Sequence, residues 1–333
     1  MELTGASQQL QQEAIVIDAL GGYGFAFRDI LAGGITATNV TLAMYGSQGM
    51  DFLLAEARRY YGLIEMNPGH LLLVEEADDI LIAKREGKLG IIFGLQNAMP
   101  LGQDVQLLPI LYKLGVRVIQ LTYSEMNPFG CGCTERNDTG LTSLGVQLVQ
   151  GMNRLGMLVD LSHVGHRTAM DAIDMSDDPV AFTHANPAAL KPAPRNKPDA
   201  LLRAVAEKGG VIGLTPYAAF CKSQPGRRPT IADFVDQVDY VVQLVGVEHV
   251  GIGTDKFEGK GKEEHWLDVY GRYPKLIGVP YEHRFVEGLE RIRDFPRLTE
   301  ALVNRGYSER DCLGLLGGNF LGLFRRVWGK VKF

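Results

Sequence analysis

The chain lacks the features that mark membrane, nucleic-acid-binding and secreted proteins. No apolar run reaches the roughly 18–20 residues that a membrane-spanning helix needs. No long basic stretch occurs and the formal net charge is −5, which argues against binding to nucleic acid or to an anionic membrane. The N-terminus has no basic start followed by a long apolar segment, so a secretory signal peptide is not expected. We therefore expect a cytoplasmic protein.

Cysteine is also scarce, with four in 333 residues. Cys131 and Cys133 are separated by one glycine, while Cys221 and Cys312 stand alone. A CxC spacing is tighter than the usual CxxC metal or redox motif, and cysteines that close rarely form a disulfide with each other. We predict four reduced thiols without a catalytic role.

Short apolar runs alternate with longer amphipathic stretches along the whole chain. The predicted strands are residues 15–20, 36–42, 89–95, 116–123, 157–162, 180–184, 210–215 and 249–255. Their continuous apolar character is typical of parallel strands that are buried on both faces. The alternation predicts a (β/α)8 barrel. A doubly wound sheet is the alternative, but no glycine-rich dinucleotide fingerprint follows the first strand.

No linker or internal repeat divides the chain, so we expect a single domain over residues 1–333. Residues 256–297 form a charged insertion with scattered aromatics after the last strand, which we predict to be a lid or an oligomer contact. The C-terminal region predicts two closing helices, and Ser308 is expected to cap the second. We also expect the chain to form a homo-oligomer.

Polar residues stand at the predicted carboxyl ends of the strands, where barrel enzymes carry their catalytic groups. In chain order these residues are Asp18, Asn39, Gln96, Tyr123, His163, His184, Tyr217 and Asp255. The spacing of His163 and His184 fits two successive strand ends, which would direct both imidazoles to one mouth of the barrel. Such a pair indicates a metal site, with hydrogen-bonded core histidines as the alternative.

Arg195 lies in the proline-rich loop that follows His184. Its guanidinium would either bind a substrate carboxylate through two N–H groups or pair with Asp199 at the surface. The first alternative predicts a small substrate that carries a carboxylate.

Several stretches resemble a known family. GLTSLGVQLVQGMNRLGMLVDLSHVG, FTHANPAALKPAPRNKPDALL and VGIGTDKFEG are similar to segments of the membrane (renal) dipeptidase family of metallo-hydrolases. LTYSEMNPFGCGCTERNDTGL resembles its bacterial members, and FPRLTEALVNRGYSERDCLGLLGGNFLGLFRRVW matches as well. The resemblance implies a metallo-dependent hydrolase barrel that carries two zinc ions and cleaves dipeptides and related small amides.

The resemblance extends to individual residues. It implies that His163 and His184 bind one zinc ion. It implies that Arg195 and Tyr217 contact substrate, and that Asp255 lies near the metals and transfers protons. Tyr123 stands where the mammalian members carry a histidine, a substitution that we also expect in bacterial relatives.

The other half of the family's metal site has no counterpart in this sequence. The His-x-Asp pair that follows the first strand falls on Leu20 and Gly22, and the bridging glutamate falls on Gln96. A neutral amide is a poor zinc ligand and cannot hold two cations together. We therefore expect one divalent ion per chain, zinc with iron or manganese as alternatives. Its third ligand would be Asp255, Gln96 or Asp18, of which Asp255 is the preferred candidate.

The sequence thus predicts a metal-dependent hydrolase that cleaves the amide bond of a dipeptide-like or N-acyl amino-acid substrate. Asp255 and Tyr123 are the predicted catalytic groups. The residues predicted to bind substrate are Arg195, Tyr217, Gln96 and Asn127. The alternative is a metal-poor barrel on the same scaffold, either a small-molecule binding protein or an enzyme with another reaction.

Overall fold

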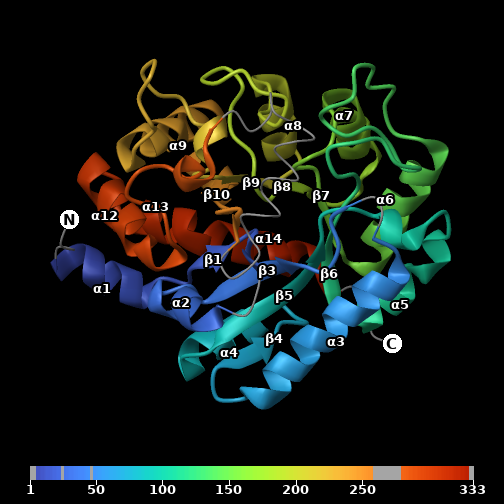
Figure 1. Cartoon of the computed structure of the whole chain (residues 1–333), viewed down its shortest axis with the longest axis horizontal. Helices are drawn as coiled ribbons and strands as arrows, with labels where there is room; N and C mark the ends of the chain where they lie inside the picture. The colour runs from blue at the N-terminus through green and yellow to red at the C-terminus, as the bar shows by residue number, and fades with distance from the viewer. Residues whose placement is uncertain (1–4, 24–25, 46–47, 258–278, 330–333) are drawn as a thin grey trace.

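A computed structural model describes residues 5–23, 26–45, 48–257 and 279–329, and eight of its strands form a parallel barrel (Figure 1). In their order around the barrel these strands are β1 (Ile17–Asp18), β3 (Ala37–Thr41), β5 (Leu89–Leu95), β6 (Val116–Gln120), β7 (Leu158–Asp160), β8 (Ala181–Phe182), β9 (Val211–Leu214) and β10 (Val250–Ile252). Each lies within one of the predicted strands. The predicted (β/α)8 barrel is therefore confirmed.

Amphipathic helices surround the strands, and none of the described helices is long and apolar enough to cross a membrane. The helices are α1 (Gly5–Glu13), α2 (Phe27–Ala32), α3 (Met50–Met66), α4 (Asp79–Glu86), α5 (Leu108–Lys113), α6 (Ser143–Leu155), α7 (His166–Met175), α8 (Asp199–Glu207), α9 (Ile231–Val245), α12 (Pro296–Arg305), α13 (Glu309–Leu313) and α14 (Asn319–Val327). Three short strands lie off the barrel path: β4 (Leu71–Leu73), β2 (Gly21–Tyr23) and β11 (Lys256–Phe257).

The two ends of the barrel differ in character. At the end opposite the site, Phe320 of α14 packs in one apolar cluster with residues from most of the barrel strands. These residues are Ile17, Ala37, Ile92, Val118, Leu158, Ala181 and Val211. This apolar layer closes one end of the barrel and leaves the carboxyl ends of the strands for polar residues.

Two closing helical segments were predicted: α12 is the first, and the second is divided into α13 and α14 by the π-helical turn Gly314–Gly318. Ser308 caps α13, since its Oγ accepts the N–H of Asp311 at 3.2 Å. Within the predicted insertion, residues 258–278 lie outside the described residues. The part from residue 279 onward packs against the loop after β9, where the N–H of Ala218 donates to the carbonyl oxygen of Arg284 at 2.8 Å.

Asp18 forms the seam at which the barrel closes. The N–H of Ala19 donates to the carbonyl of Ile252, which joins β1 to β10 at 3.0 Å. The Asp18 carboxylate accepts the backbone N–H of Thr254 at 2.7 Å and its hydroxyl at 2.6 Å. The Asp18 carboxylate also packs so closely on Gly21 that a Cβ at that position would collide with Oδ2. Only glycine fits there.

The buried Asp18 carboxyl couples folding to pH. Burial raises its pKa from 3.8 to about 7, so between about pH 4 and pH 7 the native protein holds a proton that the unfolded chain releases. This group therefore makes the native state less stable as the pH rises through that range. We expect Asp18→Asn to gain stability relative to the wild type between pH 4 and pH 8, measured by urea unfolding at a series of pH values. The exposed Asp177→Asn is the charge-matched control, and a difference that does not change with pH would contradict the linkage.

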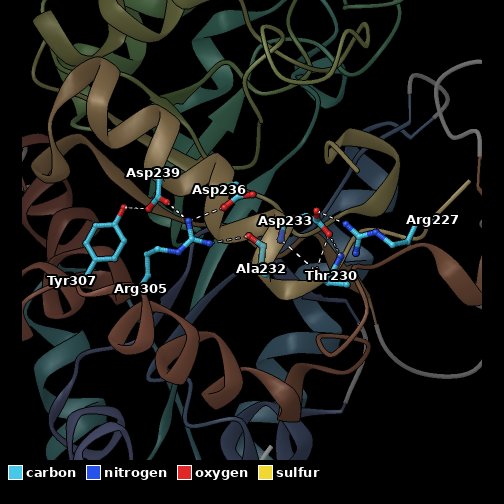
Figure 2. A network of polar contacts seen from close by, with 8 residues as sticks. All are labelled: Arg227, Thr230, Ala232, Asp233, Asp236, Asp239, Arg305 and Tyr307. Atoms are coloured by element: carbon cyan, nitrogen blue, oxygen red, sulfur yellow. Dashed lines mark hydrogen bonds and ion pairs between the residues drawn. The ribbon is translucent and has the colours of Figure 1, made fainter. Parts of the chain in front are cut away.

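An ionic network joins α9 to the end of α12 on the outer surface (Figure 2). Arg305 donates to Asp236 Oδ1 at 2.7 Å and also to Asp239. The Tyr307 hydroxyl donates to Asp239 Oδ1 at 2.8 Å. At the N-terminus of α9, Thr230 and Asp233 form a reciprocal capping box. These contacts fix a helix whose opposite face packs on the barrel.

Arg305→Met removes both ion pairs of this network and keeps the aliphatic part of the side chain. We expect the free energy of unfolding to fall by about 0.5–1.5 kcal/mol at low salt, because exposed pairs are individually weak but two of them share one guanidinium. This decrease in the free energy of unfolding should be smaller at high ionic strength, because salt screens the ion pairs. Urea unfolding at two salt concentrations measures both values, and a loss that is independent of salt would indicate packing rather than charge.

Candidate active site

The two predicted histidines meet at the carboxyl ends of neighbouring strands. His163 follows β7 and His184 follows β8, and both side chains are buried. Their Nε2 atoms lie 3.0 Å apart. The ring of Tyr123, which follows β6, stacks on His163 with centroids 4.2 Å apart. The parallel pairing of β6, β7 and β8 thus brings three predicted site residues into contact.

The second nitrogen of each imidazole is also engaged. His163 Nδ1 lies 3.1 Å from the hydroxyl of Ser124, and His184 Nδ1 lies 2.8 Å from the hydroxyl of Thr183. These hydroxyls fix the orientation of the rings and turn both Nε2 atoms toward the same point. Outer-shell partners of this kind are common for metal-binding histidines.

Burial and nearby cations keep both imidazoles neutral. Burial lowers the pKa of His163 and of His184 well below 6.5, and the positive charges of Arg195 and Lys197 lower both further. A neutral imidazole has one nitrogen without a proton, which is the form that binds a metal.

Arg195 is buried beside the two histidines. The residue is 1% exposed, and its guanidinium donates to the carbonyl oxygens of Ser162 at 2.5 Å and His184 at 2.9 Å. The surface alternative is wrong, since Asp199 accepts the Tyr240 hydroxyl and Arg195 is buried. Two of the five guanidinium N–H groups therefore hold the backbone next to the two histidines.

Lys197 is a site residue that the sequence reasoning missed. It is fully buried, and its ammonium donates to the carbonyl oxygen of Val164 at 2.6 Å. Burial lowers its pKa from 10.5 to about 7. The only signal in the sequence is its position two residues after Arg195 in the same proline-rich loop.

Asp255 and Tyr123 present free polar groups at the mouth. Asp255 has a left-handed backbone with φ of 53°, held by its N–H bond to the Leu20 carbonyl at 2.8 Å. Burial raises the pKa of its carboxyl to about 7, and Arg195 opposes the shift. Burial and the charge of Asp255 raise the pKa of Tyr123, so its hydroxyl stays protonated. In the described ranges neither side chain has a hydrogen-bond partner.

Two other residues predicted to bind substrate, Gln96 and Tyr217, contact neighbouring side chains. Gln96 donates through Nε2 to the hydroxyl of Thr41 at 2.8 Å. Tyr217 packs against Phe220 and Phe285, with ring centroids 5.0 Å and 5.6 Å away.

Asn127, which was predicted to bind substrate, has its side-chain amide bonded within the protein. Its Nδ2 donates to Asn97 Oδ1 at 2.9 Å and to the carbonyl of Leu121 at 2.8 Å. Its Oδ1 accepts the N–H groups of Phe129 and Gly130. Both donors and both acceptor positions of the amide are thus used to shape its own loop.

The residues present do not fit a two-ion site. Leu20 is apolar and buried, and Gln96 is neutral and bonded to Thr41. Across residues 5–257 and 279–329, apart from the short gaps, no group of three His, Cys, Asp or Glu side chains could hold a metal. Asp255 is therefore not placed as a third ligand beside the histidines. The two imidazoles fit a single zinc-type ion by donor chemistry and supply only part of the usual ligand set.

The comparisons with known proteins agree with the fold. A sequence model of the membrane dipeptidases, peptidase family M19, matches residues 28–279 and 277–333. An uncharacterized dipeptidase of Schizosaccharomyces pombe is 37% identical over 79% of the chain, and the dipeptidase aclJ of Aspergillus oryzae is 32% identical over 74%. The match covers 58% and 52% of these relatives, so the chain spans little more than half of their length.

Solved structures give the same result. The crystal structure of an amidohydrolase from Pseudomonas aeruginosa has a TM-score of 0.89 and 34% identity, and the match covers 97% of this chain and 99% of that one. A metallo peptidase from Rhodobacter sphaeroides, liganded with a phosphinate mimic of the dipeptide L-Ala-D-Ala, shares the fold with a TM-score of 0.79 at 22% identity, covering 95% of this chain and 100% of that chain. On its sequence and its fold, the chain belongs to the membrane dipeptidase family.

Proposed function

We propose that this protein hydrolyses the amide bond of a small dipeptide-like or N-acyl amino-acid substrate, with one divalent metal ion held by His163 and His184. The observation that carries the proposal is the pair of buried, neutral imidazoles with Nε2 atoms 3.0 Å apart at the barrel mouth. Membership of the dipeptidase family supports the reaction class. Zinc is the proposed ion, with iron or manganese as alternatives.

A bound divalent ion would polarise the scissile carbonyl and lower the pKa of a bound water to about 7. The chain's own residues do the rest. The protonated Tyr123 hydroxyl donates a hydrogen bond to the oxygen that gains negative charge in the transition state. Asp255, with a pKa of about 7, accepts a proton from the attacking water and returns it to the leaving amine.

The charge balance of the mouth favours an anionic substrate. The positions at which the family carries a His-x-Asp pair and a bridging glutamate hold Leu20, Gly22 and Gln96, so carboxylates are missing there. Arg195 is a buried cation close to the histidines, and Lys197, whose pKa is about 7, adds part of a second positive charge. A substrate carboxylate would offset this positive charge, which supports a substrate with a free carboxyl group.

A metal-poor barrel is the second candidate, and one observation favours it. A hydrogen bond between the two imidazoles satisfies both nitrogens without an ion, and no third ligand is grouped with them in the described part of the chain. Under this alternative the mouth would bind a small carboxylate without hydrolysing it.

Bound metal distinguishes the two candidates. We expect about one ion per chain by elemental analysis, as purified or after loading with zinc, iron or manganese, and loss of that ion in His163→Ala. His249→Ala is the control, since His249 lies just before β10 and contacts the Gly210 carbonyl at 2.9 Å. Two ions per chain would contradict the one-metal site. No ion after loading would establish the metal-poor barrel.

The catalytic roles give a separate prediction. If a screen of dipeptides and N-acyl amino acids identifies a substrate, Tyr123→Phe should lower kcat by about 100- to 1,000-fold with a smaller change in KM, because the lost hydrogen bond acts in the transition state. Asp255→Asn should lower kcat by a similar factor and remove the ionisation near pH 7 from the pH–rate profile. An unchanged kcat in either variant would remove that residue from the mechanism.

A further inference from the structure

A buried carboxylate lies behind the histidine pair. Asp160, the last residue of β7, is 1% exposed. Its Oδ1 accepts the N–H of Ser162 at 3.0 Å, the hydroxyl of Ser162 at 2.6 Å and the N–H of Thr183 at 3.0 Å. Its Oδ2 accepts the hydroxyl of Thr183 at 2.6 Å. Asp160 thereby joins the ends of β7 and β8 just before each histidine.

The protons in this group can be assigned by counting donors. Burial raises the pKa of Asp160, and its hydrogen bonds from Ser162 and Thr183 oppose that rise. A hydroxyl has one proton, and when Asp160 is ionised Ser162 and Thr183 both donate theirs to its carboxylate. Thr183 Oγ1 also lies 2.8 Å from His184 Nδ1, and with its proton already used it can only accept there. His184 Nδ1 must therefore carry a hydrogen. The neutral ring then has a lone pair on Nε2, the atom that faces His163.

The proton on His163 follows from this assignment. Two lone pairs at 3.0 Å would repel, so in the metal-free protein His163 Nε2 carries the hydrogen and donates it to His184. His163 Nδ1 then accepts from the Ser124 hydroxyl at 3.1 Å. Within the described residues the Ser124 hydroxyl has no other hydrogen-bond partner, so it can rotate from donor to acceptor. His163 can therefore change its tautomer, whereas His184 cannot.

We propose that Asp160, acting through Thr183, is a positioning residue that fixes the Nδ1–H tautomer of His184 and keeps its Nε2 lone pair directed into the site. The inference deepens the proposed one-metal function, since a metal on Nε2 requires that lone pair. The Ser124 hydroxyl serves as the adjustable partner, because His163 must move its proton to Nδ1 before its own Nε2 can bind a metal.

The Asp160→Asn variant distinguishes control of the His184 tautomer from a purely structural role in linking β7 to β8. The asparagine oxygen would stay on the side of the backbone N–H groups of Ser162 and Thr183, because those groups can only donate. Its NH2 group would then face the Thr183 hydroxyl and donate to it. The hydroxyl would in turn donate to His184 Nδ1, which moves the His184 proton to Nε2. The strands stay joined, but the tautomer reverses.

The test reads the tautomers directly in metal-free protein. We would record two-bond ¹H–¹⁵N correlation spectra of ¹⁵N-histidine-labelled protein at about pH 8, where both rings are neutral. His163→Gln and His184→Gln assign the signals. We expect Nδ1–H for His184 in the wild type and Nε2–H in Asp160→Asn. Asp138→Asn is the matched control, because Asp138 accepts several donors from Thr168, Arg167 and Gly140 but touches neither histidine.

A second pair of variants keeps the test decisive if Asp160→Asn does not fold. Thr183→Val removes, with little change in shape, the hydroxyl that accepts from His184 Nδ1, so His184 should no longer hold its proton on Nδ1. Thr183→Ser keeps a hydroxyl there and should keep the proton on Nδ1. Zinc affinity, measured by competition with a chelator, should fall about 10- to 100-fold in Asp160→Asn and Thr183→Val and stay near the wild type in Thr183→Ser. A His184 ring that keeps Nδ1–H in Asp160→Asn or Thr183→Val, or that lacks it in the wild type, overturns the proposal.

The two readouts separate the two hypotheses. The tautomers are measured without metal, so the expected pattern in a protein that binds no zinc, iron or manganese would reject the one-metal function and keep the role of Asp160. Normal zinc binding together with a His184 tautomer that does not change in Asp160→Asn would keep the one-metal function and reject the role of Asp160.

Discussion

The structure of the site depends on how buried charges find partners at the ends of β7 and β8. A charge that leaves water without a partner costs several kcal/mol, so each buried ion must bond to something nearby. Here Asp160 accepts backbone and hydroxyl donors from Ser162 and Thr183, and Arg195 donates to the Ser162 and His184 carbonyls. The same bonds that make burial of these charges tolerable also fix the backbone that carries both imidazoles. Stability and geometry of the site are thus coupled.

The barrel and the histidine pair could be predicted from the sequence because both follow from periodicity and parallel pairing. Continuous apolar runs at regular spacing define the strands, and the carboxyl ends of parallel strands meet at one mouth. Asn127, Arg195 and Lys197 could not be placed in this way. Spacing says which loop a side chain belongs to, but the choice between substrate, backbone and solvent depends on burial and on the carbonyls within reach.

The loss of half of the family's ligand set changes the electrostatics more than the shape. Leu20 and Gln96 fill their positions without a charge, and Gln96 bonds to Thr41 within the barrel wall. The positions that correspond to that ligand set therefore carry no negative charge in this chain. The Arg195 and Lys197 side chains are buried close to the histidines.

The hydrogen bonding around His184 argues against a histidine pair that merely persists in the core. Folding requires that β7 and β8 be joined, and the bond from the backbone N–H of Thr183 to Asp160 already joins them. Folding does not require that His184 be fixed with its unprotonated Nε2 directed into the site, nor that His163 be able to move its proton through Ser124. This asymmetry restricts the change needed to admit an ion to a single proton shift on His163. A site maintained in that form is organised for a ligand at Nε2.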